Sequence, residues 1–369
     1  MNETLKTTAF LAAAIGLAVA ASVTAPERRA ASLFSDEGEA FYPEFKDPQD
    51  VKAIEVVDYD EPTATARPLK VEFRKSRWLV ASNNDYPIDV GDRLVKTAAA
   101  LIDLKKDQVR SDLAQDHPKF GVIDPLDQKV SSLQGRGKRI TLRDAKKSVL
   151  ADYILGKPVE GKPGWRYLRT PDSKRTYSVK TDADPSARFA DWVNAGLLRM
   201  PAASIQKITV IPYSFDAATG AVGQATPVTP APGSAQWKSI TAALDGLKIV
   251  DARPKPPDMA HDLASGQMML SMTTALALRR YGYFLTQTGR ILASDGEMTV
   301  AMANGVSYQI RFGDVTTTGD RYLFVTTSTT DPNGEKASRD LNVRFAEWFY
   351  VIANADFQKL RLTTSARIP

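Results

Sequence analysis

The stretch Arg166-Tyr167-Leu168 recurs in the second half of the chain as Arg321-Tyr322-Leu323, and each copy is followed by the pattern Arg-Phe-Ala-x-Trp. That pattern runs from Arg188 to Trp192 in the first half and from Arg344 to Trp348 in the second. Marks that recur in the same order along a chain are the signature of a duplicated structural unit. The sequence therefore predicts that the second half is a divergent copy of the first.

Further marks follow the same order in both halves. A tryptophan comes first, then an aromatic residue followed by glycine, then a strand-like run that exits through glycine, and finally a second tryptophan. The marks are Trp78, Phe120, Gly121, Gly156 and Trp192 in the first half, and Trp237, Tyr281, Gly282, Gly313 and Trp348 in the second. We predict two tandem homologous domains, residues 51–200 and 204–369, in which Trp192 and Trp348 occupy equivalent places on the core face of a helix.

The local patterns favour an α+β fold. Apolar and polar residues alternate over 54–57, 69–74, 139–142 and 149–155, which predicts half-buried strands. Helical spacing of apolar residues covers 89–104 and 185–198. The second domain has two insertions, a Pro-, Thr- and Gly-rich loop at 219–234 and a Met- and Leu-rich helix at 259–280. Each domain is therefore expected to be a small, mostly antiparallel sheet packed with one or two helices.

The N-terminus carries a targeting or anchoring segment. Thr7 to Ala25 contains no charged residue and would span about 28 Å as a helix, close to the hydrocarbon thickness of a membrane. We favour a transmembrane anchor within residues 1–29, with a cleaved signal peptide ending at Ala25 as the alternative. Residues 30–50 would follow as a linker or a first docking segment. This places the bulk of the chain in the periplasm or elsewhere outside the cytoplasm, on a single inner-membrane anchor.

Composition excludes several classes of function. The 369 residues include no cysteine, so disulfides, thiol nucleophiles and thiolate metal sites are excluded. The net charge is +5, and the Lys and Arg residues are scattered rather than gathered in the basic stripe of a nucleic-acid binder. No nucleotide-binding glycine motif occurs, because Gly135-Arg136-Gly137 has the wrong spacing. We expect no metal, no cofactor and no nucleic acid as partners.

The residues that could carry catalysis are few. His117 and His261 are the only histidines, and His261 is followed by Asp262 and Ser265, the residue types of a catalytic triad. Neighbouring residues on a helix point in different directions, however, so a triad is not expected there. Three other features are read first as solvated surface and core: the acidic group Asp58, Asp60 and Glu61, the basic run over 138–147, and the two Arg-Phe-Ala-x-Trp tryptophans. The basic run is also compatible with lipid headgroups or an anionic glycan. The sequence predicts no catalytic site.

The pattern resembles a bacterial family known as domain of unknown function 4340. The resemblance rests on the turn Phe120-Gly121-Val122-Ile123-Asp124-Pro125, the exit Leu155-Gly156-Lys157 and the strand Trp165-Arg166-Tyr167-Leu168. In the second half Tyr281-Gly282-Tyr283 lacks the proline of that turn. The resemblance implies an N-terminally anchored protein outside the cytoplasm. Because members are often encoded beside gliding-type ABC transporter components, it also implies an accessory role in an envelope export or assembly complex.

Two functions from different classes remain open at this point. One is a non-catalytic envelope module that binds an ABC-transporter-associated or other envelope protein. The other is a protein that binds or processes envelope polysaccharide, which would need two acidic side chains about 5–10 Å apart in a cleft.

Overall fold

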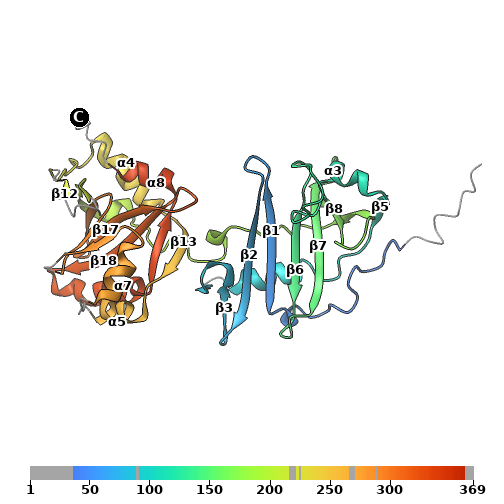
Figure 1. Ribbon diagram of the computed structural model, residues 1–369, viewed down its shortest axis with the longest axis horizontal. Coiled ribbons are helices and arrows are strands. Elements are labelled where there is room, and N and C mark those ends of the chain that lie inside the picture. The colour runs from blue at the N-terminus through green and yellow to red at the C-terminus, as the bar shows by residue number, and fades with distance from the viewer. Residues whose placement is uncertain are drawn as a thin grey trace, which may run out of the picture.

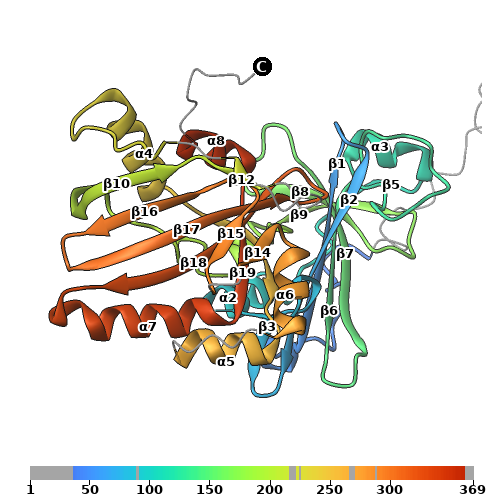
Figure 2. The same cartoon turned by 60° about the vertical axis from the view of Figure 1, so that its left-hand side comes forward.

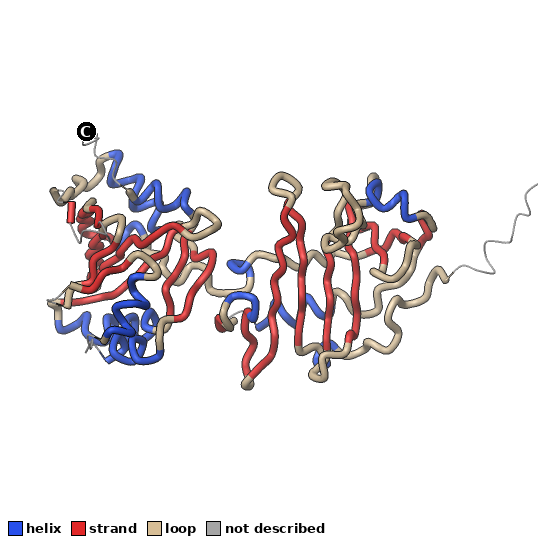
Figure 3. Tube along the Cα trace, viewed as in Figure 1, coloured by secondary structure: helices blue, strands red, loops and turns tan. Residues whose placement is uncertain are grey.

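Two antiparallel sheets, one in each half of the chain, dominate the computed structural model (Figure 1). The structure describes residues 36–88, 91–215, 222–223, 226–265, 271–286 and 289–361. A nine-stranded sheet forms the first lobe, up to about residue 200, and a six-stranded sheet forms the second lobe. The lobes lie one after the other along the long axis of the molecule, and the described helices gather mainly in the second lobe (Figure 3).

The sheet of the first lobe joins two runs of consecutive strands, β4 to β1 and β6 to β9, and adds β5 at the edge beside β9. Its strand order is β4-β3-β2-β1-β6-β7-β8-β9-β5, and all pairs are antiparallel. The strands are β1 (Ala53–Asp60), β2 (Thr65–Arg74), β3 (Arg77–Val80), β4 (Tyr86–Pro87), β5 (Gln108–Ser111), β6 (Lys138–Arg143), β7 (Val149–Pro158), β8 (Trp165–Arg169) and β9 (Thr176–Lys180). Two helices, α2 (Gly91–Ala99) and α3 (His117–Phe120), accompany them, with short 3-10 turns at η2 (Pro48–Asp50), η3 (Ala81–Asn83), η4 (Ala114–Asp116) and η5 (Phe189–Asp191).

The second lobe has a sheet of order β10-β16-β17-β18-β19-β13, again antiparallel throughout. The strands are β10 (Ile205–Ile211), β13 (Ile249–Pro254), β16 (Glu297–Met302), β17 (Val306–Val315), β18 (Arg321–Thr329) and β19 (Trp348–Ile352). Two small hairpins flank it, β11 (Ser214–Phe215) with β12 (Val222–Gly223) and β14 (Tyr283–Leu285) with β15 (Ile291–Ala293). The helices are α4 (Ala235–Asp245), α5 (Pro257–Ser265), α6 (Met272–Arg279), α7 (Glu335–Ala346) and α8 (Asn354–Leu360), with turns η6 (Ala202–Ser204) and η7 (Pro332–Gly334).

In the first sheet, the six neighbouring strands β1-β6-β7-β8-β9-β5 follow the same order as the six strands of the second sheet. In each lobe the opening strand (β1, β10) lies beside a strand that comes much later in the sequence (β6, β16). Three further antiparallel strands follow in order. The strand that comes directly after the first helix (β5 after α2, β13 after α4) then lies at the far edge, beside the last strand (β9, β19). The strands β2, β3 and β4 extend the first sheet beyond this shared order.

The second sheet is covered on both faces. Along β18, Leu323 and Val325 belong to the main hydrophobic cluster, whereas Phe324 between them belongs to a separate cluster with Met259 of α5 and Leu278 of α6. This alternation follows from the two-residue period of a strand. In two views, α4 and α8 lie at one end of the lobe, and α5 and α7 at the other (Figures 1 and 2).

The lobes are joined by a loop of the first lobe that docks on the edge strand β13. Asn83 Nδ2 donates to Asp251 Oδ1 at 2.9 Å, and Asn84 Nδ2 donates to the Ala252 carbonyl at 3.1 Å. Asn84 has a φ of 58°, a left-handed conformation that asparagine tolerates better than most residues. The Tyr86 ring lies 4.7 Å from the Trp348 ring, and the main hydrophobic cluster continues from one lobe into the other.

The first described residues pack against the first lobe. We call Asp36–Phe45 the strap. Its backbone pairs with the segment before β5: Gly38 N donates to Lys106 O at 2.7 Å, and Phe41 N donates to Leu104 O at 3.0 Å. This part of the predicted 30–50 segment therefore lies docked on the fold.

The α+β class with antiparallel sheets and several helices is confirmed. The helix expected over 185–198 is wrong, because only the three-residue turn η5 forms there. Phe189, Trp192 and Val193 are nevertheless buried in the core, on an irregular path instead of a helix. Of the second-lobe insertions, the loop at 219–234 contains β12 and lies partly outside the described residues, and residues 259–280 hold parts of two helices, α5 and α6. The predicted anchor, residues 1–29, lies outside the described residues. None of the helices in the described part of the chain combines the length and apolar character needed to cross a bilayer.

Candidate functional site

The glycine marks of the first half meet in one contact. Gly121 ends α3 with a φ of 68°, and Gly156 on β7 lies so close that a Cβ on it would overlap the carbonyl of Phe120. Arg166 Nη2 donates to the Gly156 carbonyl at 2.9 Å, and the Tyr167 ring packs 4.7 Å from Phe120. A glycine in each partner is therefore required by backbone approach and by conformation.

The marks of the second half make the same set of contacts. Gly282 follows α6 with a φ of 81°, and a Cβ on Gly313 of β17 would overlap the carbonyl of Tyr281. Arg321 Nη1 donates to the Gly313 carbonyl at 2.7 Å, and the Tyr322 and Tyr281 rings lie 4.9 Å apart. Both sets are structural, because their polar groups bind backbone carbonyls or neighbouring acids.

The tryptophan marks lie at positions that do not match. Trp78 is on strand β3, whereas Trp237 is on helix α4. Trp192 follows β9, is fully buried, and donates its Nε1 hydrogen to the Ser186 carbonyl at 2.8 Å. Trp348 begins β19, the strand whose place in the sheet order corresponds to β9 itself. The Arg-Phe-Ala-x-Trp motif therefore follows the last strand in the first lobe but leads into the corresponding strand in the second.

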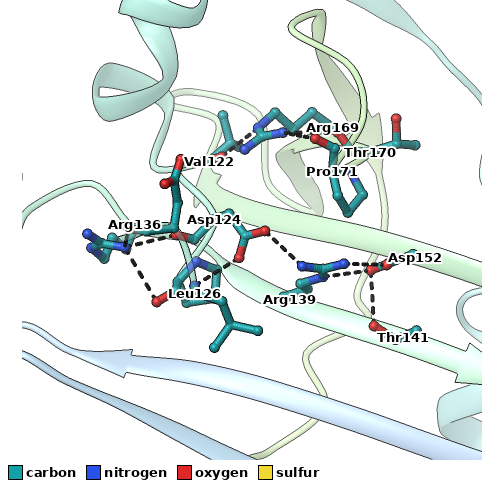
Figure 4. Close-up of polar contacts among 12 residues, drawn as sticks. Val122, Asp124, Leu126, Arg136, Arg139, Thr141, Asp152, Arg169, Thr170 and Pro171 are labelled. Atoms are coloured by element: carbon teal, nitrogen blue, oxygen red, sulfur yellow. Dashed lines mark hydrogen bonds and ion pairs between the residues drawn. The ribbon is translucent and has the colours of Figure 1, made fainter. Parts of the chain in front are cut away.

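An arginine network fixes the long loop between α3 and β6 (Figure 4). Arg136 donates to the carbonyls of Asp124 and Asp127, each at 2.9 Å, and of Val130 at 2.7 Å. Arg139 bridges the carboxylates of Asp124 and Asp152 at 2.9 and 2.8 Å. Within the basic run, Arg139 is thus used inside the fold to bind acids from a neighbouring loop and strand, whereas Lys146 and Lys147 are exposed.

The buried Arg169 completes this network from the other side. Its Nε donates to the Val122 carbonyl at 2.7 Å, and its Nη1 reaches the carbonyls of Thr170 and Pro171 at 3.0 and 3.1 Å (Figure 4). Burial lowers the pKa of this guanidinium from its usual value, although nearby Asp124 and Asp127 oppose the shift. The network therefore holds a loop closed through backbone carbonyls and two carboxylates.

Neither histidine forms a triad in the described residues. His117 is buried, and its Nε2 lies 2.8 Å from the Lys174 carbonyl. Burial lowers its pKa, with the Lys174 carbonyl opposing the shift. His261 is exposed on α5, and the Ser265 hydroxyl donates to the Asp262 backbone carbonyl at 3.0 Å rather than to the imidazole.

The acidic group is also engaged. Asp60 pairs with Arg67, and Glu61 Oε1 accepts from Gly135 N at 3.1 Å. Within the described ranges, no three His, Asp or Glu side chains come together as a metal site requires.

A cavity of about 460 Å³ lies between α5 and α7. Small and apolar residues line most of it, with Trp348 and the 55% exposed Val343 among them. A second cavity of about 220 Å³, at the junction of the lobes, shares Trp348 and Glu347 with the first and adds Tyr86 and Arg344. The C-terminal turn of α7 is therefore a common wall of two adjoining hollows, and we call this region the α7 groove.

Lys255 lies in the floor of the α7 groove. Its ammonium donates to the Phe345 and Trp348 carbonyls at 2.6 and 2.7 Å and sits over the Phe324 and Phe349 rings at 4.7 and 5.2 Å. Burial lowers the pKa of Lys255 to about 7. Since both carbonyls belong to the end of α7 and the start of β19, this lysine caps the helix terminus and stabilises the wall of the groove.

A third cavity, of about 780 Å³, lies on the first lobe between α2 and the segment that follows β9. It holds the carboxylates of Asp182, Asp184 and Asp191. Asp184 contacts Lys138 at 2.5 Å and Arg166 at 3.5 Å, while Asp191 contacts Arg188 at 2.9 Å. Two of the three acids are thus neutralised by basic neighbours, which does not favour a pair of catalytic carboxylates.

Comparison with protein families decides the relationship of this chain. The model of the family "Domain of unknown function (DUF4340)" matches residues 78–265, just over half of the chain. The chain belongs to the DUF4340 family. A search of curated proteins found no match, and neither did a search of solved structures.

The DUF4340 match crosses both sheets of the structure. It begins in β3, includes the glycine contact around Gly121 and Gly156, and ends with α5 beside the α7 groove. The family resemblance expected from the turn and strand motifs is therefore confirmed. Sequence reasoning missed Lys255, Asn84 and Tyr86, because no periodic pattern surrounds them. Lys255 stands between two prolines, Asn84 in a short loop and Tyr86 in the two-residue strand β4.

Proposed function

We propose that this DUF4340 protein is a non-catalytic, membrane-anchored module of the cell envelope that docks on a partner of an ABC-transporter-associated export or assembly system. The observation that carries the proposal is the α7 groove, whose larger cavity, between α5 and α7, is mainly apolar and adjoins a smaller, more polar cavity at the junction of the lobes. Concave apolar surfaces at such junctions are common binding sites. The buried amino group of Lys255 donates to two backbone carbonyls, which suits a rigid docking wall better than a reactive centre.

We further propose that the lobes are tandem homologous units. The matching strand orders and the two equivalent sets of aromatic, glycine, arginine and tyrosine contacts support this. Duplication of this kind gives two units that each bury only part of their surface and present the remainder to other molecules.

The membrane and transporter parts of the proposal rest on other grounds. The uncharged segment from Thr7 to Ala25 supports an anchor. The resemblance to a family often encoded beside gliding-type ABC transporter components supports the identity of the partner. The groove would then accept an apolar segment from the extracytoplasmic part of that partner, packed on Val343 and Trp348.

Affinity purification from detergent-solubilised membranes tests this function. The full-length tagged protein should recover an ABC-transporter-associated membrane protein, identified by mass spectrometry. Val343→Asp places a charge on the exposed groove wall and should reduce recovery of that protein at least tenfold. Val315→Asp is the matched control, because Val315 is similarly exposed (52%) on β17 of the same lobe but does not line the groove. Recovery of no such membrane protein, or equal recovery with both variants, would contradict the proposal.

A further inference from the structure

The strap attaches the start of the described chain firmly to one edge of the first lobe. Asp36 accepts from Lys106 Nζ at 2.8 Å, Arg175 Nη1 at 3.2 Å and the Tyr177 hydroxyl at 2.6 Å. Partial burial by itself would raise the pKa of Asp36, but the hydrogen bonds from Lys106 and Tyr177 outweigh it and lower the pKa to about 2. The carboxylate is therefore charged at any physiological pH, so these ion pairs persist over the whole physiological pH range.

Aromatic packing reinforces this ionic contact. The Phe41 ring meets Tyr177 and Tyr153 edge-on at 5.1 and 5.9 Å, and the Tyr42 hydroxyl donates to the Asp152 carbonyl at 2.8 Å. Edge-to-face pairs of this kind add to the stabilisation from buried area. Together the two ends of the strap are bound to β7 and β9, so the chain leaves the fold at a fixed place, next to Asp36.

The second lobe is docked at the opposite edge of the same sheet. Asp36 binds β9 and its preceding turn, beside the edge strand β5, whereas Asn84 and Tyr86 bind the second lobe from the edge strand β4. The nine strands of the sheet give eight spacings between these edges, and at roughly 4.8 Å per spacing the edges lie about 40 Å apart along the sheet. The start of the described chain and the second lobe accordingly occupy opposite ends of the long axis (Figure 1).

The segment between the uncharged stretch and the strap is short. Residues 26–35 separate Asp36 from the end of the uncharged segment, and ten residues reach at most about 35 Å when fully extended. If the uncharged segment is the anchor, the strap edge cannot stand farther than this from the bilayer surface.

We propose that the strap fixes the first lobe as the membrane-proximal end of the molecule and holds the second lobe, with the α7 groove, away from the bilayer. This inference rests on the anchor in the proposed function. It deepens that function by naming the class of surface that meets the groove: a part of the partner that lies outside the lipid, not a transmembrane segment.

Single-cysteine labelling tests the orientation directly, because the natural chain has no cysteine. The full-length protein is reconstituted in liposomes that carry a headgroup-linked acceptor dye. A donor dye is placed at Leu113→Cys, near β5, or at Lys336→Cys, on α7; both positions are exposed. Energy transfer to the lipid should be at least threefold stronger from position 113. Equal transfer from both positions, or stronger transfer from position 336, overturns the inference.

Release of the strap tests whether it sets the orientation. The double variant Asp36→Asn, Phe41→Ala removes both the charge that binds Lys106 and Arg175 and the ring that packs on Tyr153 and Tyr177. The start of the strap should then detach and the tether lengthen, so transfer from position 113 should fall at least twofold. Glu44→Gln is the matched control, because Glu44 is an exposed strap residue and transfer should stay unchanged. A melting curve for each variant checks folding. If the double variant folds and its transfer equals that of the parent, the strap does not set the orientation.

Flotation on a density gradient distinguishes a failure of the anchor from a failure of the orientation. If the full-length protein does not float with liposomes, the anchor in the proposed function is wrong and the orientation falls with it. If it floats but the two labels report equal distances, the anchor stands and only the orientation is overturned.

Discussion

Gly156 and Gly313 show how a single missing Cβ can determine the contact between a helix end and a strand. In each lobe the strand glycine faces the carbonyl of an aromatic residue, and an arginine from the next strand binds the glycine's own carbonyl. A side chain at this place would force the backbones apart, so the requirement for glycine comes from space and not from turn conformation. The sequence marks these residues but does not reveal that they touch.

We expect Gly313→Ala to lower the free energy of unfolding by about 2–3 kcal/mol, because the added Cβ overlaps the Tyr281 carbonyl and atoms of the Tyr283 ring. Gly156→Ala should have a similar effect in the first lobe. Gly196→Ala serves as the control, since its nearest neighbour would be 3.8 Å away. Urea denaturation measures all three, and a Gly313→Ala protein as stable as the control would show that the contact can relax.

Lys255 predicts an unusual dependence of stability on pH. Its pKa is about 7 in the folded protein and near 10.5 in the unfolded chain. Between these values the unfolded chain binds the proton more tightly, so stability should rise as pH increases from 7 to 10. The rise should be on the order of 2–4 kcal/mol, at about 1.4 kcal/mol for each pH unit.

Lys255→Met should remove that rise, while Lys238→Met, an exposed position on α4, should leave it unchanged. The measurement is the urea midpoint at several pH values. A parent protein with a flat profile over this range would mean that the two carbonyls and the two rings keep the ammonium charged when folded.

At the scale of elements, the loop that carries Asn84 makes one of the contacts that join the lobes. Asn84→Ala removes the amide that binds β13 and places a Cβ-bearing residue without local hydrogen bonds at a φ of 58°. We expect a loss of about 1–2 kcal/mol from these two causes together. Asn84→Gly keeps the conformation accessible and should lose about half as much. Denaturation curves compare the three proteins, and equal stability of Asn84→Gly and the parent would show that the amide contributes nothing.

The strands could be predicted from the sequence because their information is local. Alternation over two-residue periods located β1, β2, β6 and β7, and antiparallel hairpins follow from short turns between them. The segment over 185–198 has helical spacing, but Pro185 precedes it and Gly196 interrupts it, and burial of Trp192 is satisfied by an irregular path. Spacing alone does not distinguish a helix from a buried irregular segment.

The candidate site could not be predicted in the same way. The α7 groove combines α5, α7 and a first-lobe loop, which lie far apart in the chain. Lys255 lies between Pro254 and Pro256, a context typical of an exposed turn, and only the end of α7 makes its burial favourable. Sites that depend on such distant pairings have no local pattern.

At the scale of the whole molecule, the continuous core couples the lobes. Tyr86 packs on Phe189 of the first lobe at 5.2 Å and on Trp348 of the second at 4.7 Å. We expect one cooperative unfolding transition, with dyes at positions 113 and 336 reporting the same urea midpoint. Tyr86→Ala should separate the two midpoints, because it removes the ring that both lobes share. Two midpoints in the parent protein would contradict this coupling.

The order of strands also controls when the protein can fold. β13 is made early in the second lobe, but its only strand neighbour in the sheet is β19, close to the end of the described chain. In the first lobe, β5 likewise pairs only with β9, which comes later in the sequence. Such distant pairings raise the contact order and slow folding. A chain still emerging from the ribosome cannot complete its second sheet until Trp348–Ile352 is available, so a truncation just before Trp348 leaves an open sheet edge on a protein that is otherwise nearly full length.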